Sequence, residues 1–181
     1  MNHDNAFITG WGHTVFGKLD AVDSEQLIRD AVDPALHTAG LEAADIDGVF
    51  VGHFNGGFMP QDFSASLVAL AVPQLRHVPA VRMENACATG SAAIWAALDA
   101  VQSGRVRHAL VVGFEIMNAV PAPVVAQTLL RCSYVKEEAD TPAGFAGVFG
   151  RIAGSYFERF GDQGDALAAI AAKNLSLIHI S

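Results

Sequence analysis

Residues 82–93 read RMENACATGSAA, and this stretch decides the fold. A short strand ends at Met83, Cys87 follows in a turn, and a helix of small residues begins at once. The amide donors of a helix N-terminus carry about half a positive charge and favour a thiolate over a thiol. Small residues such as Gly90 leave room for a substrate to approach. Cys87 is therefore a candidate nucleophile, although its position alone also fits an unreactive buried thiol.

The chain around this stretch alternates between short apolar runs and amphipathic segments. Such alternation predicts an α/β fold with a mixed, mostly parallel sheet that is covered by helices. We expect strands at residues 6–12, 49–51, 79–83 and 108–114. We expect helices at about residues 24–39, 61–72 and 88–103.

The first helix has clear start and stop signals. Asp23 or Ser24 can cap its N-terminus, and Gly40 can end it. Pro34 lies inside the apolar periodicity, and a proline in a helix interior costs about 3 kcal/mol. The sequence therefore predicts a kink or break near residue 30.

The pattern changes after the last expected strand. Prolines and glycines mark a long loop excursion at about residues 118–150, with one or two short helical pieces. Helices are expected again from about residue 150 and over 165–174. We assign residues 1–174 to a single N-terminal domain and interpret residues 175–181, LSLIHIS, as a non-native or out-of-frame tail.

Composition excludes several classes of protein. The 181 residues are 51% hydrophobic and 17% charged, with a net charge of -8, which is too apolar for a disordered chain. No basic cluster suggests a nucleic-acid partner, and no apolar run reaches the length of a membrane span. Two cysteines cannot form the disulfide framework of a small secreted protein. Without an evident signal peptide, we expect a cytoplasmic protein.

Residues 84–91, ENACATGS, resemble the nucleophilic-cysteine motif of the thiolase family. The similarity is greatest to the sterol-carrier-protein-associated and acetyl-CoA acetyltransferase-like branch. Residues 45–49, 113–117 and 171–174 are also similar to segments of that family, and the resemblance extends over residues 5–174.

The resemblance implies an acyltransferase of lipid metabolism, with Cys87 forming an acyl-enzyme from acyl-CoA. Coenzyme A and its thioesters are then the substrates, and no metal or redox cofactor is needed. The resemblance also places Met117 and Asn118 near the acyl pocket, as expected for residues after a strand end. We expect a homodimer or higher oligomer, by analogy with the family.

The same resemblance covers only the N-terminal half of a two-half fold. The family's activating histidine and second cysteine come from the other half, and none of the seven histidines here lies in a matching motif. Cys132 is not in the context of the second cysteine either. We therefore expect this chain to be inactive alone.

Two alternatives remain open at this point. One is a ketoacyl-synthase-type condensing enzyme, which shares the fold and the cysteine. The other is a non-catalytic thiolase-like subunit that works as a partner protein in an acyl-CoA-binding complex.

Overall fold

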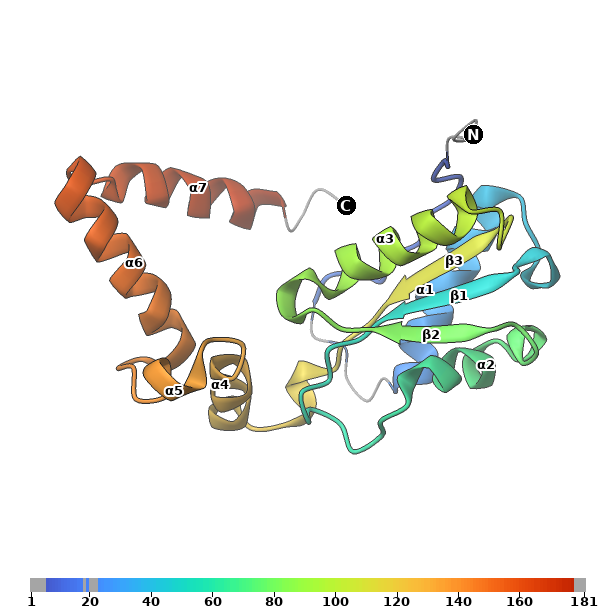
Figure 1. The fold of residues 1–181 in the computed structure, drawn as a ribbon, viewed down its shortest axis with the longest axis horizontal. Helices are drawn as coiled ribbons and strands as arrows, with labels where there is room; N and C mark the ends of the chain where they lie inside the picture. Colours follow the sequence, from blue (N-terminus) through green and yellow to red (C-terminus); the bar gives the residue numbers. More distant parts are fainter. Residues whose placement is uncertain (1–5, 18, 20–22, 178–181) are drawn as a thin grey trace. The chain divides into compact units, whose positions relative to one another are not determined.

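The computed structural model describes residues 6–17, 19 and 23–177. The chain divides into two compact units, which we describe separately (Figure 1). The first unit consists of residues 1–14 and 19–119, and the second of residues 15–18 and 120–181. The division falls at the start of the segment expected to be a loop excursion.

The first unit is built on a parallel sheet in the order β2-β1-β3. Its strands are β1 (Gly48–Gly52), β2 (Ala80–Met83) and β3 (Ala109–Gly113). Gly52 is aligned with Met83 on one side and with Gly113 on the other. Because all three strands are parallel, their carboxyl ends meet at one edge, where ligands bind in open α/β sheets. The expectation of an α/β fold with a mostly parallel sheet is confirmed.

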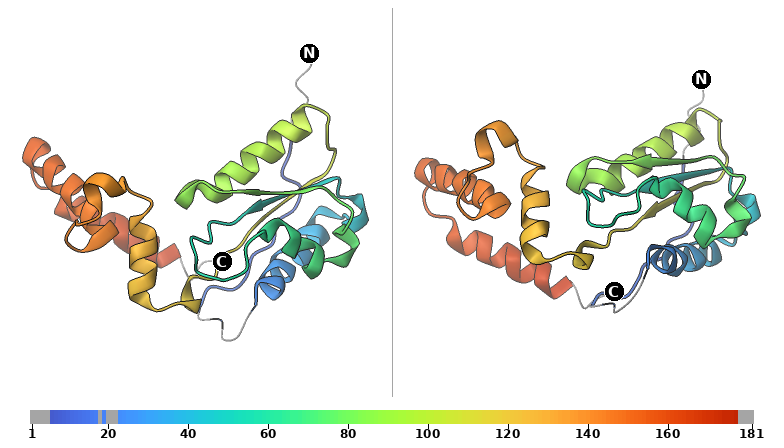
Figure 2. Two further views of the ribbon diagram at one scale, coloured as in Figure 1. Left: turned by 60° about the horizontal axis from the view of Figure 1, so that its bottom comes forward. Right: turned by 90° about the horizontal axis from the view of Figure 1, so that it is seen from below.

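Helices cover both faces of this sheet (Figures 1 and 2). The helix α3 (Thr89–Gln102) covers one face, and α1 (Ser24–Ala39) and α2 (Leu67–Ala71) cover the other. Three alanines of α3, spaced to share one helix face, pack on Phe50 at the centre of β1: Ala93, Ala97 and Ala100. Their small side chains let α3 approach the sheet closely, so its N-terminus is held over the carboxyl edge.

The opposite face carries the larger part of the core. Side chains of β1 and β3 pack with those of α1 and α2 and of the neighbouring 3-10 turns: Val49, Val51, Leu110, Val112, Ile28, Val32, Val68 and Leu75. The segment between β1 and β2 is less helical than expected over 61–72. It contains 3-10 turns at Ser64–Ser66 and Pro73–Leu75 on either side of the short α2. Pro73 accounts for the early end of α2, since proline cannot donate the next helical hydrogen bond.

The first helix departs from the sequence expectation. Asp23 caps it as predicted, because its Oδ1 accepts the Gln26 N–H at 2.7 Å. Yet α1 continues unbroken through Pro34 to Ala39. Ile28 and Val32, before the proline, are 0% and 1% exposed. We attribute the intact helix to this burial, which offsets the cost of one missing hydrogen bond.

The expected strand at residues 6–12 does not form, and residues 6–15 adopt neither helix nor strand. This segment runs along α1, where the Trp11 N–H donates to Thr38 Oγ1 at 3.0 Å. Gly10 and Gly12 lie so close to the α1 backbone that a Cβ on either would meet a carbonyl oxygen. The glycines that suggested the end of a strand instead permit contact with a helix.

Asp47 joins the start of β1 to the start of β3. Its Oδ2 accepts the N–H groups of Arg107 at 2.9 Å and His108 at 3.0 Å. These two backbone hydrogen bonds lower the pKa of Asp47 below its ordinary value, and the one from His108 has the larger effect.

We expect Asp47→Asn to make unfolding easier at neutral pH. Because the folded-state pKa is lowered, the contribution of the carboxylate is fully present above the ordinary carboxyl pKa and is lost as the pH falls through the folded value. The difference between the variant and the wild type should therefore shrink as the pH falls from neutral to below about 4, the ordinary carboxyl pKa. Urea unfolding across this range measures it, with Asp33→Asn on the exposed side of α1 as the control. A difference that grows on acidification would contradict this role.

The second unit is helical: α4 (Ala122–Leu130), α5 (Val135–Glu138), α6 (Gly144–Phe160) and α7 (Gly164–Ser176). The segment expected to be a loop excursion with short helical pieces thus contains α4, α5 and the start of α6. The expected later helices are present in α6 and α7. Residues 175 and 176 of the expected tail belong to α7 and Leu177 is its C-cap, whereas residues 178–181 lie outside the described residues.

None of the helices in the described part of the chain combines the length and the apolar character that crossing a bilayer requires.

Candidate functional site

Cys87 lies in a turn that the neighbouring residues hold by four hydrogen bonds. Cys87 is exposed and lies in a 3-10 turn (Ala86–Ala88) between β2 and α3. The buried Thr89 hydroxyl accepts the Asn85 N–H at 2.8 Å and donates to the Ala86 carbonyl at 2.6 Å. The Ala88 N–H donates to the Asn85 carbonyl at 2.9 Å, and Glu84 Oε1 accepts the Ala86 N–H at 2.6 Å. The backbone on both sides of Cys87 is therefore fixed, while Cys87 itself is exposed.

The residue before Cys87 has an uncommon backbone conformation. Ala86 adopts a φ of 45°, in the left-handed region that side chains other than glycine rarely enter. Backbone strain of this kind costs on the order of 1–3 kcal/mol and is concentrated at functional sites. The expected sequence of strand, cysteine turn and helix is confirmed, with one 3-10 turn placed before the α-helix.

The N-terminus of α3 is suited to an anion. Its N-cap is Ala88, so no side chain of that residue can occupy the first amide donors, and its first turn contains no acidic residue. Free amide donors at a helix N-terminus attract negative charge. A negatively charged oxygen near Cys87 would therefore find donors that are already in place.

Met117 and Asn118 also follow a strand at the carboxyl edge. They lie in a 3-10 turn (Met117–Ala119) after β3, and both are exposed. Since β1 separates β2 from β3, these residues and Cys87 follow strands that are not neighbours. The structure thus places all three after carboxyl strand ends, and their contact with an acyl group stays a prediction.

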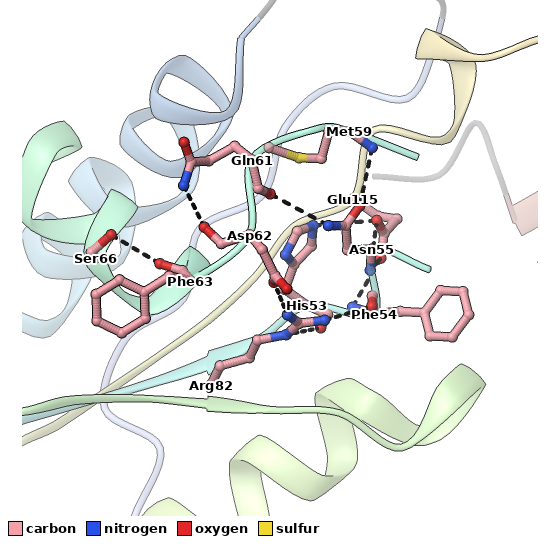
Figure 3. Close-up of polar contacts among 10 residues, drawn as sticks. All are labelled: His53, Phe54, Asn55, Met59, Gln61, Asp62, Phe63, Ser66, Arg82 and Glu115. Carbon is pink, nitrogen blue, oxygen red and sulfur yellow. Dashed lines mark hydrogen bonds and ion pairs between the residues drawn. The ribbon is translucent and has the colours of Figure 1, made fainter. Parts of the chain in front are cut away.

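The sequence reasoning missed a polar cluster between these two positions (Figure 3). His53, directly after β1, is 0% exposed, and its Nε2 lies 3.3 Å from Oε1 of Glu115, which follows β3. The His53 ring stacks on Phe114 with 4.2 Å between ring centroids. Arg82 of β2 donates to the carbonyl oxygens of His53 at 2.8 Å and Phe54 at 2.7 Å.

The cluster organises the loop that follows β1. Glu115 accepts the N–H groups of Phe54 at 3.0 Å and Asn55 at 3.2 Å. The Asn55 side chain in turn accepts the Met59 N–H at 3.0 Å, and Arg82 also pairs with Asp62. The Arg82 guanidinium thus connects the loop to β2, and the Glu115 carboxylate connects it to the end of β3. The Asn55 side chain forms a hydrogen bond within the loop.

A sequence signal for this cluster did exist. His53 follows Gly52 and Glu115 follows Gly113-Phe114, so each comes directly after an apolar strand. Parallel strands bring such positions to one edge, but their pairing requires that β1 and β3 be neighbours. The strand order, which local patterns do not give, was the missing information.

Metal binding has no support among the residues that the structure describes. They contain no group of three or more His, Cys, Asp or Glu side chains arranged to hold a metal ion.

Most of the chain is similar to known proteins. Residues 6–176 match the family described as "Thiolase, N-terminal domain". An acetyl-CoA acetyltransferase of Methanothermobacter thermautotrophicus is 31% identical over 170 residues, covering 92% of this chain and 43% of that protein. A second, from Methanocaldococcus jannaschii, is 35% identical over 156 residues, covering 85% of this chain and 39% of that protein. Sterol carrier protein 2 of Gallus gallus is 31% identical over 114 residues, covering 61% and 20% respectively.

Two conclusions follow from these matches. The chain spans about two fifths of the length of the acetyl-CoA acetyltransferases that it resembles. Since the match to the family extends from the segment before α1 to the end of α7, the chain belongs to the thiolase family and corresponds to its N-terminal domain.

Proposed function

We propose that Cys87 accepts an acyl group from an acyl-CoA, as the nucleophile of a thiolase-like acyltransferase. The observation that carries this proposal is the exposed thiol on a fixed turn, directly before the uncapped N-terminus of α3. The relatives named acetyl-CoA acetyltransferase support the choice of coenzyme A thioesters as substrates. A partner subunit without catalysis would have no use for an exposed thiol held in this way.

The chemistry follows from the position of the sulfur. With a simple acyl-CoA, Cys87 Sγ attacks the thioester carbonyl carbon, the bond to the coenzyme A sulfur breaks, and coenzyme A leaves with the proton that the thiol lost. The carbonyl oxygen gains negative charge during attack, and amide donors at the start of α3 stabilise such charge. The product is an acyl-cysteine thioester.

The thiolytic reaction uses the same acyl-enzyme. With a 3-ketoacyl-CoA, Sγ attacks the 3-keto carbon, the C2–C3 bond breaks, and acetyl-CoA leaves once C2 has gained a proton. A second coenzyme A thiol then takes the shortened acyl group. In the synthetic direction, the C2 carbanion of a second acetyl-CoA attacks the carbonyl carbon of acetylated Cys87, the bond to Sγ breaks, and the Cys87 thiolate is released.

These reactions also need groups that move the protons. We infer that a histidine and a second cysteine outside these 181 residues supply them, so the isolated chain does not turn over. The shorter span of this chain relative to the acetyltransferases supports this view.

Acyl transfer is tested by mapping the acylated residue. The longest natural chain that contains these residues is incubated with acetyl-CoA, digested at mildly acidic pH and analysed by mass spectrometry. We expect one acetyl group, on Cys87, that hydroxylamine removes as it removes other thioesters. Stable labelling at a lysine, or labelling of Cys132 in its place, would refute the proposal.

The proposal includes self-association through the face that α3 covers only in part. Apolar side chains remain open on both sides of α3 and on α3 itself: Val81 (43% exposed), Val111 (36%), Ile94 (51%) and Trp95 (65%). An apolar surface of this kind favours association. We expect dimers or larger species in sedimentation velocity at micromolar concentration, and a stable monomer would contradict this.

A further inference from the structure

The chemical steps proposed above do not use the pair formed by His53 and Glu115. His53 is completely buried, and neither ring nitrogen makes a hydrogen bond within the described residues. Its Nε2 lies 3.3 Å from Glu115 Oε1. A buried polar group without hydrogen bonds is costly, so the presence of His53 at the carboxyl edge requires an explanation.

Glu115 acts mainly on backbone groups. One carboxylate binds two successive N–H groups, those of Phe54 and Asn55, and the glutamate side chain is 25% exposed. Hydrogen bonds to an ionised acceptor are about twice as strong as neutral ones. From the other side, Arg82 binds the carbonyl oxygens of His53 and Phe54. The backbone of residues 53–55 is thus held between an anion and a cation (Figure 3).

The same backbone lies against the turn that carries Cys87. The His53 N–H donates to the carbonyl of Met83 at 3.3 Å, four residues before Cys87. A Cβ placed on Gly52 would lie 3.4 Å from Thr89 Cγ2 and from Gly90 Cα. Thr89 is also the residue whose hydroxyl bridges Asn85 and Ala86. The end of β1 therefore lies between Glu115 on one side and the Cys87 turn on the other.

We propose that Glu115 is a positioning residue for Cys87, acting through the backbone of residues 52–55. The carboxylate fixes this segment, the segment packs on Thr89 and Met83, and these two residues set the turn that presents the thiol. The inference rests on the proposed function, since it concerns the placement of the acylated sulfur. Small displacements of a reacting group can lower rates by up to about a hundredfold.

The test compares Glu115→Ala with Glu115→Gln, using Glu158→Ala on the exposed surface of α6 as the matched control. Hydrogen exchange is measured at the amides of Phe54 and Asn55 and at those of Asn85 and Ala88. We expect Glu115→Ala to accelerate exchange at all four by roughly tenfold or more, while amides within α3 keep their protection. The glutamine variant retains a side-chain acceptor and should restore part of the protection.

Alkylation of Cys87 by iodoacetamide supplies the second readout, because it needs no coenzyme A. We expect its rate to change at least about threefold in Glu115→Ala, to return toward the wild-type value in Glu115→Gln, and to stay unchanged in Glu158→Ala. Unchanged alkylation, with exchange accelerated only at Phe54 and Asn55, would overturn the proposal. If Glu115→Ala loses protection throughout α3, its fold is disturbed. The exchange and alkylation rates of Glu115→Gln then decide, by the same criteria, whether Glu115 positions the turn.

Acetyl-CoA labelling separates this inference from the proposed function. If wild-type Cys87 is not acetylated, the proposed function fails, and exchange and alkylation still decide whether Glu115 positions the turn. If the wild type and Glu115→Ala are acetylated equally fast, the positioning role fails and the acyl transfer stands.

Discussion

Cys87→Ala is expected to abolish transfer of the acetyl group from acetyl-CoA, with labelling reduced by at least about a thousandfold. Alanine removes the only atom that can form the acyl-cysteine bond, and the exposed site tolerates the smaller side chain. Because Cys87 lies at the surface, the free energy of unfolding should change by less than about 0.5 kcal/mol. Mass spectrometry of the acetylated peptide and urea unfolding together measure the two effects.

Two further variants make this result specific. Cys87→Ser keeps the shape of the side chain but provides a hydroxyl, which is a weak nucleophile without an adjacent base, so it should also show almost no labelling. Cys132→Ala, in the second unit, should be labelled at the wild-type rate. Normal labelling of Cys87→Ala, or its loss in Cys132→Ala, would show that the acyl group is carried elsewhere.

The Cys87 turn could be predicted because its signals are local. Within residues 82–93, the apolar strand, the cysteine and the small residues that follow specify a strand end, a turn and a helix start. The structure adds details that these letters do not contain, such as the positive φ of Ala86 and the bridge formed by Thr89. Both details depend on how the end of β2 meets the first turn of α3.

The cluster of His53 and Glu115 could not be predicted in the same way. The two residues are 62 positions apart, and only the strand order places them at neighbouring strand ends. The opposite error occurred at Gly10 and Gly12, which suggested the end of a strand, whereas they allow the chain to lie against the backbone of α1. At Pro34 the predicted kink or break was wrong, because the compensating burial of Ile28 and Val32 depends on tertiary packing.

Val51→Asp is expected to prevent folding of the first unit. Val51 is 0% exposed in the central strand and packs in the core shared with α1 and α2. An unpaired carboxylate in such a place costs several kcal/mol after relaxation, which is comparable with the whole stability of a typical domain. Circular dichroism and urea unfolding should show a loss of the cooperative transition that the wild type displays.

The matched control is Val111→Asp, which makes the same change on a neighbouring strand. Val111 is 36% exposed at the side of the sheet that α3 leaves partly open, so its carboxylate can reach water and should cost little more than about 1 kcal/mol. A folded Val51→Asp with an unchanged urea midpoint would mean that the core does not lie between the sheet and α1. An equal loss of stability in both variants would mean that the face beside α3 is covered in the folded protein. The apolar surface proposed for self-association would then not be open.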